Sequence, residues 1–169
     1  MDFLALGFSL GGNPIVPSLP PLSRSHCPTE IKPLAERLVQ DLPSYANRAN
    51  VKGKTRSQLA DLNHVVIARQ PEFEPIDLPN AKPDPNLKQI FITTLEHQTI
   101  GRDRVQFQQY HWFFLARTHK AGWRLVQSFS RSQPYPQGGT MTPPRESTQG
   151  AIAQGVRTWL RDCEAGRGK

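Results

Sequence analysis

Titratable side chains gather around one predicted hairpin in the middle of the chain. They are Glu96, His97, Asp103 and His111. Carboxylate and imidazole groups support general acid–base chemistry when they lie within hydrogen-bond reach of each other or of a ligand. His111, together with Tyr110, could line a pocket under a curled sheet. The alternative interpretation is that these side chains are satisfied on a sheet face and do no chemistry.

The register of this hairpin decides which of these groups meet. If the turn is centred on Ile100–Gly101, His97 lies opposite about Arg104 and His111 lies opposite about Ile90. The two histidines are then well separated along the ladder. We therefore expect no histidine dyad and assign no catalytic residue, so the chain is not predicted to be an enzyme.

The sequence predicts neither a metal site nor a bound cofactor. No two cysteines stand at the two-residue spacing of structural zinc sites, and no two histidines stand at helical spacing. His26–Cys27 is a single adjacent pair, which is too few ligands for a metal ion.

The net charge is the strongest electrostatic feature. Lys and Arg number 21 against 14 Asp and Glu, which gives a net charge of +7 at pH 7. Basic strands with interleaved aromatic residues can bind single-stranded nucleic acid through stacking and phosphate contacts. We favour a solvated basic face, or an acidic protein or membrane surface as the partner. The candidate basic surface consists of Arg102, Arg104, Arg117, Lys120, Arg124 and Arg131.

Proline marks the limits of the elements that must position these groups. Fourteen of the 16 prolines fall in the segments 14–28, 71–85 and 134–144, and residues 86–133 contain none. Proline removes a hydrogen-bond donor from a strand ladder, so we expect the paired strands in the proline-free block.

The periodicity of apolar residues predicts an α+β fold, with one curled antiparallel sheet of about four strands and a helix on either side of it in sequence. This layout is similar to that of cystatin or NTF2. One helix is expected over residues 28–50, kinked or divided at Pro43, and the last over residues 148–163. A change of parity in the third strand predicts a β-bulge near Gln108–Gln109. The strands are expected at Leu62–Arg69, Leu87–His97, Arg104–Arg117 and Trp123–Phe129.

The segment 1–26 is apolar and then proline-rich, so we interpret it as an export signal with a linker, or as a disordered extension. The domain itself is expected at residues 27–166, with a tail at 167–169. Export would place it in the periplasm or thylakoid lumen, and the alternative is the cytoplasm. In an exported chain, a disulfide between Cys27 and Cys163 is favoured over two free thiols. No segment outside the leader approaches the ~18 apolar residues of a membrane span.

Several short motifs occur along the domain. They are DLPSYANR (41–48), PEFEP (71–75), FITTLE (91–96), YHW (110–112), GWRLV (122–126), TPPR (142–145) and WLRDC (159–163). Their combination resembles an uncharacterised family of exported cyanobacterial proteins, and the resemblance covers about Cys27 to Gly166. It implies a cyanobacterial source and an exported chain. It implies no activity and no catalytic residue.

The expected function is that of a non-catalytic, exported binding or assembly accessory protein. Its contact surfaces would be the acidic, proline-rich loop at Gln70–Asn86 and the basic hairpins. Two alternatives stay open: a small-ligand pocket protein or enzyme of the NTF2-like type, with Tyr110 and His111 in the pocket, and a basic binder of single-stranded nucleic acid. The oligomeric state is left open.

Overall fold

The computed structural model describes residues 26–52, 64–67, 69–74, 84, 86–100, 102–135 and 139–167. The predicted leader up to residue 25, most of the acidic loop and nearly all of the basic loop after the first helix lie outside the described residues. Within the described part, no helix is long and apolar enough to cross a bilayer.

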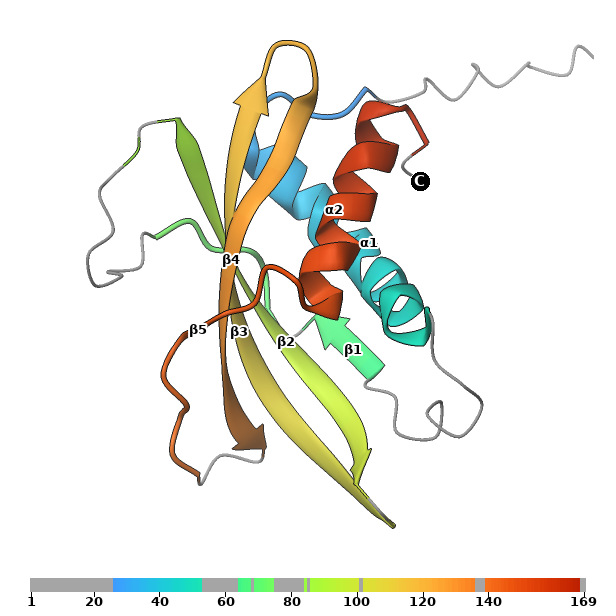
Figure 1. Cartoon of the computed structure of the whole chain (residues 1–169), viewed down its shortest axis with the longest axis vertical. Coiled ribbons are helices and arrows are strands. Elements are labelled where there is room, and N and C mark those ends of the chain that lie inside the picture. Colours follow the sequence, from blue (N-terminus) through green and yellow to red (C-terminus); the bar gives the residue numbers. More distant parts are fainter. Residues whose placement is uncertain are drawn as a thin grey trace, which may run out of the picture.

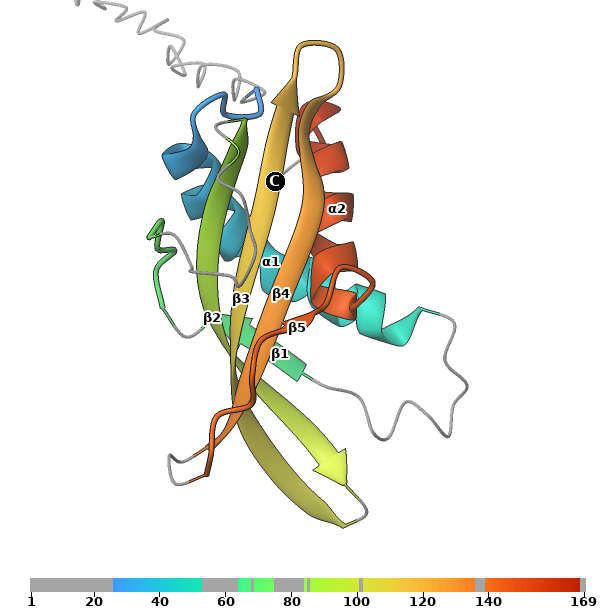
Figure 2. The ribbon, with the colours of Figure 1, turned by 60° about the vertical axis from the view of Figure 1, so that its left-hand side comes forward.

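One antiparallel sheet and two helices form the domain, which confirms the predicted α+β class (Figure 1). The strands follow chain order across the sheet, from β1 to β5. Both helices cover the same face of the sheet (Figure 2). The elements are α1 (Ile31–Val51), β1 (His64–Ile67), β2 (Leu87–Ile100), β3 (Asp103–Thr118), β4 (Gly122–Tyr135), β5 (Arg145–Glu146) and α2 (Ala151–Glu164).

The described sheet has five strands, one more than predicted. The additional strand, β5, has only two residues and pairs with Phe129 and Ser130 of β4. Its position directly after Pro143–Pro144 concealed it, because prolines at that point predict a loop. β4 is also longer than predicted and continues through Pro134, close to its end.

The β2–β3 register lies two residues from the predicted one. The strands pair without interruption from Leu87 opposite Ala116 to Ile100 opposite Asp103. A shift of two residues keeps every side chain on its expected face, because the side-chain period of a strand is two. It does move the facing groups by about 7 Å along the ladder.

The predicted bulge near Gln108–Gln109 is wrong. The register shift lies instead in the β3–β4 pairing, where Phe114 is opposite Gln127 but Leu115 is opposite Leu125, so that Val126 is the extra residue. The change of parity in the sequence has another cause: both faces of β3 carry buried aromatic residues. Trp112 is 6% exposed on one face and Phe113 is 1% exposed on the other.

The two helices pack tightly against each other. α1 is a single helix that continues through Pro43, so it is not divided there. At the contact, a Cβ atom on Gly155 of α2 would lie 2.9 Å from the backbone nitrogen of Ala46. A glycine is therefore required at position 155 for the helices to approach this closely. In the same interface, the Trp159 indole donates a hydrogen bond of 2.8 Å to the carboxylate of Asp41.

A tyrosine–carboxylate contact joins the same two helices further along. The Tyr45 hydroxyl donates to Asp162 at 3.3 Å. Burial, together with the negative charge of Asp162, raises the pKa of Tyr45 above its usual value of 10.0. The neutral phenol is thus the form that the helix contact favours.

A disulfide between Cys27 and Cys163 confirms the predicted pairing and ties the chain before α1 to the end of α2. Two hydrogen bonds of 2.9 Å reinforce this end of the domain. The Trp123 indole donates to the carbonyl of Pro28, and the Trp123 backbone N–H donates to the Glu164 carboxylate. A disulfide at this point indicates a non-reducing setting.

Candidate functional site

The helix-facing side of the sheet has two chemically different ends. We call them the apolar end and the polar end, and β2, β3 and β4 contribute to both. The apolar end consists of Ile90, Ile92, Phe113, Leu115, Trp123 and Leu125. The polar end consists of Thr94, Glu96, Gln109, His111, Ser128 and Ser130. Buried polar groups are costly unless they are hydrogen-bonded, so the polar end calls for an explanation.

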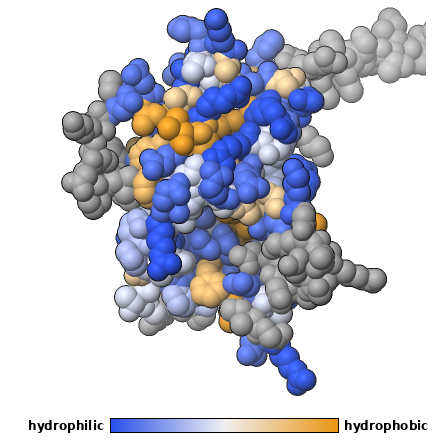
Figure 3. All heavy atoms as spheres, viewed as in Figure 1, coloured by the Kyte–Doolittle hydropathy of each residue, from blue (hydrophilic) through white to orange (hydrophobic). Residues whose placement is uncertain are grey.

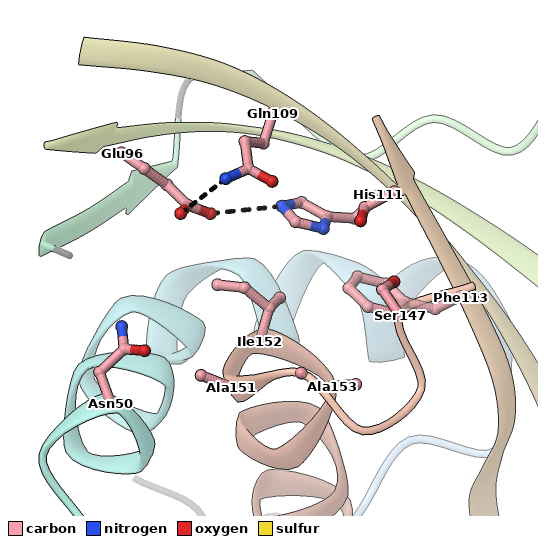
Figure 4. Close-up of a pocket in the computed structure, with 11 residues that line it drawn as sticks. Asn50, Glu96, Gln109, His111, Phe113, Ser147, Ala151, Ile152 and Ala153 are labelled. Carbon is pink, nitrogen blue, oxygen red and sulfur yellow. Dashed lines mark hydrogen bonds and ion pairs between the residues drawn. The ribbon is translucent and has the colours of Figure 1, made fainter. Parts of the chain in front are cut away.

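A cavity of about 250 Å³ lies between the polar end and the two helices (Figure 4). It is smaller than the roughly 300–1,000 Å³ of pockets that hold drug-sized ligands. At about 30 Å³ per molecule, it has room for about eight waters. The lining residues are Asn50, Glu96, Gln109, His111, Phe113, Ser130, Ser147, Gly150, Ala151, Ile152 and Ala153.

Glu96 is the single carboxylate among the lining residues, and it is 4% exposed. The Gln109 side-chain amide donates a hydrogen bond of 2.8 Å to its Oε2 atom. The Thr94 hydroxyl donates to its Oε1 atom at 3.5 Å. Each carboxylate oxygen therefore has a donor from the protein, which holds the group in a defined orientation.

His111 faces Glu96 across the same surface of the sheet. Its Nε2 atom lies 3.7 Å from Oε1 of Glu96 and 3.0 Å from the Thr94 hydroxyl oxygen. The ring stacks on Phe113, with centroids 5.9 Å apart. The imidazole is 3% exposed to solvent. In Figure 4 its other nitrogen, Nδ1, points away from Glu96 and toward the start of α2.

The beginning of α2 forms the opposite wall of the cavity (Figure 4). Gly150 precedes the helix, and no side chain caps its first turn. The segment before it is fixed to β4, because the Ser147 N–H donates to the carbonyl of Ser128 and the Ser128 N–H donates to the Thr148 hydroxyl. The helix start is therefore held at a defined distance from the sheet.

β1 is the edge strand of the sheet and lies beside Glu96. Val65 of β1 lies opposite Glu96, and its side chain is fully buried. The Asn47 side chain accepts a hydrogen bond from the Val65 N–H at 2.9 Å and donates one to the Val65 carbonyl at 3.2 Å. Through Asn47, α1 holds the short strand β1 in place, and with it the wall of the polar end.

Of the two predicted pocket residues, His111 lines the cavity and Tyr110 does not. Adjacent residues of a strand point to opposite faces, so the two side chains cannot share a pocket. Tyr110 lies on the helix-free face, where its ring stacks on Phe91 with centroids 6.1 Å apart. The guanidinium of Arg131 lies over the Tyr110 and Trp112 rings, at 5.5 and 5.3 Å from their centroids.

The predicted basic residues do not gather in one patch. Arg102 and Arg104 are exposed at the β2–β3 turn, whereas Arg117, Lys120 and Arg124 are exposed at the β3–β4 turn. These turns lie at opposite ends of the 16-residue strand β3. Arg131 belongs to neither group, because it stacks on aromatic rings.

Hydrophobic residues gather at the surface over the upper part of the sheet (Figure 3). Val126, the extra residue of the bulge, is 50% exposed.

The remaining acid–base candidates lie away from the cavity: His97 bonds to the Gln106 side chain at 3.1 Å, and Asp103 begins β3 at the turn. The described residues contain no group of three or more His, Cys, Asp or Glu that could hold a metal ion.

Gln109, Thr94 and the start of α2 are site residues that the sequence did not single out. Gln109 and Thr94 lie directly opposite each other. The signal that could have found them is the alternation in β2, where the inward positions change from Ile90 and Ile92 to Thr94 and Glu96 toward the β2–β3 turn. The contribution of α2 depends on how the helix packs against the sheet and α1, and no local sequence pattern indicates it.

The fold and the cavity define a class: an open antiparallel sheet covered on one face by two helices, with a polar pocket between the layers. No protein-family model, curated protein or solved structure matches this chain.

Proposed function

We propose that the protein binds a small polar molecule in the cavity between the polar end of the sheet and α2. The observation that carries this proposal is the burial of Glu96 and His111 at the wall of a cavity of about 250 Å³. An acid and an imidazole removed from water are unfavourable for a purely structural purpose, because apolar side chains of similar volume would fill the space as well.

The chemistry of the wall indicates the kind of ligand. Carboxylate, amide and hydroxyl groups come from the sheet, while Phe113 and Ile152 supply apolar surface. The ligand is therefore a molecule of about 6–12 non-hydrogen atoms that carries several hydroxyl or amide groups, because the space equals about eight waters. The two predicted contact surfaces have less support, since the basic residues are divided between two turns.

The compartment forms part of the proposal. The disulfide between Cys27 and Cys163 supports an exported protein, and the periplasm or the thylakoid lumen are the compartments that fit it. A ligand of this protein would then be one that is present outside the cytoplasm.

The test is a ligand screen by NMR. A library of small hydroxylated and amide-bearing molecules is added to the ¹⁵N-labelled protein, and shifts of the Ala151–Ala153 amides are followed. Ala151→Leu fills the cavity and should abolish the shifts. The matched control, Ala165→Leu, makes the same change at the exposed opposite end of α2 and should preserve them. Shifts that survive Ala151→Leu would place the ligand elsewhere and overturn the proposal.

A further inference from the structure

We infer that His111 is a general base that removes a proton from a small hydroxy-carbonyl compound held in the cavity. This inference rests on the proposed function and adds a reaction to it. The observation behind it is the chain of contacts from His111 through Thr94 to Glu96, which leaves the second imidazole nitrogen directed into the cavity.

The contacts favour one tautomer of His111. If the Thr94 hydroxyl donates its single proton to Glu96, 3.5 Å away, it accepts one from Nε2 of His111, 3.0 Å away, because a carboxylate can only accept a hydrogen bond. The Glu96 oxygen 3.7 Å from Nε2 favours a proton on that nitrogen as well. Nδ1 consequently carries the lone pair, and a base needs a lone pair that faces its substrate.

The same contacts stabilise the product of proton transfer. When Nδ1 accepts a proton the imidazole becomes a cation, and Glu96 lies close enough to offset the new charge, since both side chains are almost completely buried. Thr94 is thus a positioning residue, because it orients the ring and does not line the cavity. Glu96, which does line the cavity, stabilises the charged form of the ring.

The start of α2 supplies the complementary charge. Its first turn lacks a side-chain cap and lines the cavity opposite the sheet. The N–H groups of a first helical turn and the helix dipole favour negative charge at this point. An oxygen that becomes negative during the reaction would therefore be stabilised by donors already in place.

These parts suit an enolisation. The C–H bond next to the carbonyl breaks, the proton goes to Nδ1, and the electron pair forms a C=C bond while the C=O π pair moves onto oxygen. The negative oxygen then takes up a proton, a second proton is added to the former carbonyl carbon, and the hydroxyl group on the deprotonated carbon loses its proton to become the new C=O, which gives the isomeric hydroxy-carbonyl compound. Nothing is oxidised or reduced overall, and no co-reactant is needed.

Hydrogen–deuterium exchange is the direct test, because it detects proton removal whatever the product. Dihydroxyacetone in D₂O is the probe, and loss of its CH₂ proton signal is followed by NMR. We expect the full chain to accelerate exchange and His111→Gln to lower that rate by about 10²-fold or more. His97→Gln is the matched control, because His97 lies in β2 away from the cavity, and its rate should be unchanged.

A second variant separates positioning from folding. Thr94→Val has nearly the shape of the native residue but breaks the chain of contacts. We expect it to slow exchange by about tenfold or more. We also expect ¹⁵N NMR of the ring to show loss of the single Nε2–H tautomer. A merely structural Thr94 would leave the tautomer unchanged. If His111→Gln does not fold, the Thr94→Val result decides the question.

The outcomes distinguish this inference from the proposed function. Shifts of the Ala151–Ala153 amides with dihydroxyacetone, but exchange equal in the native chain and His111→Gln, would overturn the general base and leave ligand binding standing. An absence of shifts with dihydroxyacetone would overturn the substrate class and the inference with it. Only failure of the wider ligand screen would overturn binding itself.

Discussion

The two ends of the helix-facing side of the sheet are built from the same three strands, yet they serve different purposes. At the apolar end, Leu115, Leu125 and Trp123 pack against the helices, and the disulfide and the Trp123 hydrogen bonds lie beside them. At the polar end, the space between the layers is a cavity, and most of the side chains that the sheet directs into it are polar.

This contrast separates stability from the proposed ligand binding within one small domain. Burial of apolar surface is the dominant favourable term in folding, and the apolar end supplies it. The polar end contributes less, because removing a carboxylate and an imidazole from water is costly even where they have partners. Natural proteins retain such arrangements where a site needs them. Substitutions at the two ends should therefore have different effects.

Loss of the disulfide should have the largest effect, because it closes a loop with a sequence separation of 136 residues at the apolar end. We expect the double variant Cys27→Ser/Cys163→Ser to lower the free energy of unfolding by about 2–5 kcal/mol. Urea denaturation with a tryptophan fluorescence readout measures it. The check on the native chain is alkylation followed by mass spectrometry, once with reductant and once without. If the alkylated protein has the same mass in both cases, the disulfide does not form.

Truncation within the apolar end should come next. Leu115 is fully buried, so Leu115→Ala leaves a cavity and should lower the free energy of unfolding by about 2–5 kcal/mol. Val126→Ala, at a half-exposed position of the neighbouring strand, is the control and should change it by less than about 1 kcal/mol. Similar losses for both variants would contradict the contrast between the ends.

A change at the helix contact should have an intermediate effect and should reach the polar end. Gly155→Ala places a methyl group against the backbone of Ala46 and should cost about 1–3 kcal/mol. Since α2 also forms the cavity wall, we expect chemical shifts of Ala151–Ala153 to move with it. If those shifts stay constant while stability falls, the two ends are more independent than the packing indicates.

Much of this architecture could be predicted from the sequence, because local patterns determine it. The order of helices and strands and the position of Arg117 opposite Trp123 follow from periodicity and turns. The Cys27–Cys163 pair followed from the places of the two cysteines at helix ends, together with the expected export of the chain. The contact between Glu96 and His111 could not, because it depends on the register. The predicted turn placed His111 opposite Ile90 rather than Ile92, which moves it about 7 Å further from Glu96.

The pocket was harder to predict than the sheet, for a related reason. Pairing His111 with Tyr110 ignored the alternation of faces that a strand imposes, although the sequence contains it. The wall formed by α2 depends on tertiary packing, chiefly the close approach at Gly155 and the fixation of Ser147 to Ser128. The sequence at the start of α2 does not indicate either contact.

The smallest loss of stability should come from making the polar end resemble the apolar end. We expect the double variant Glu96→Leu/His111→Phe to lower the free energy of unfolding by about 1 kcal/mol, which is less than for Glu96→Leu alone, since apolar replacement of both members of a buried polar pair is often close to neutral. The amide of Gln109 and the hydroxyl of Thr94 lose their acceptor in both variants, but Glu96→Leu alone also leaves the buried imidazole of His111 without its acidic neighbour. Denaturant unfolding of the single and double variants, combined with the NMR ligand screen, shows whether the polar end is needed for folding or for ligand binding. A double variant that unfolds several kcal/mol more easily would mean that the polar cluster is needed for folding, whereas one that is stable but no longer binds ligand would assign the cluster to the site.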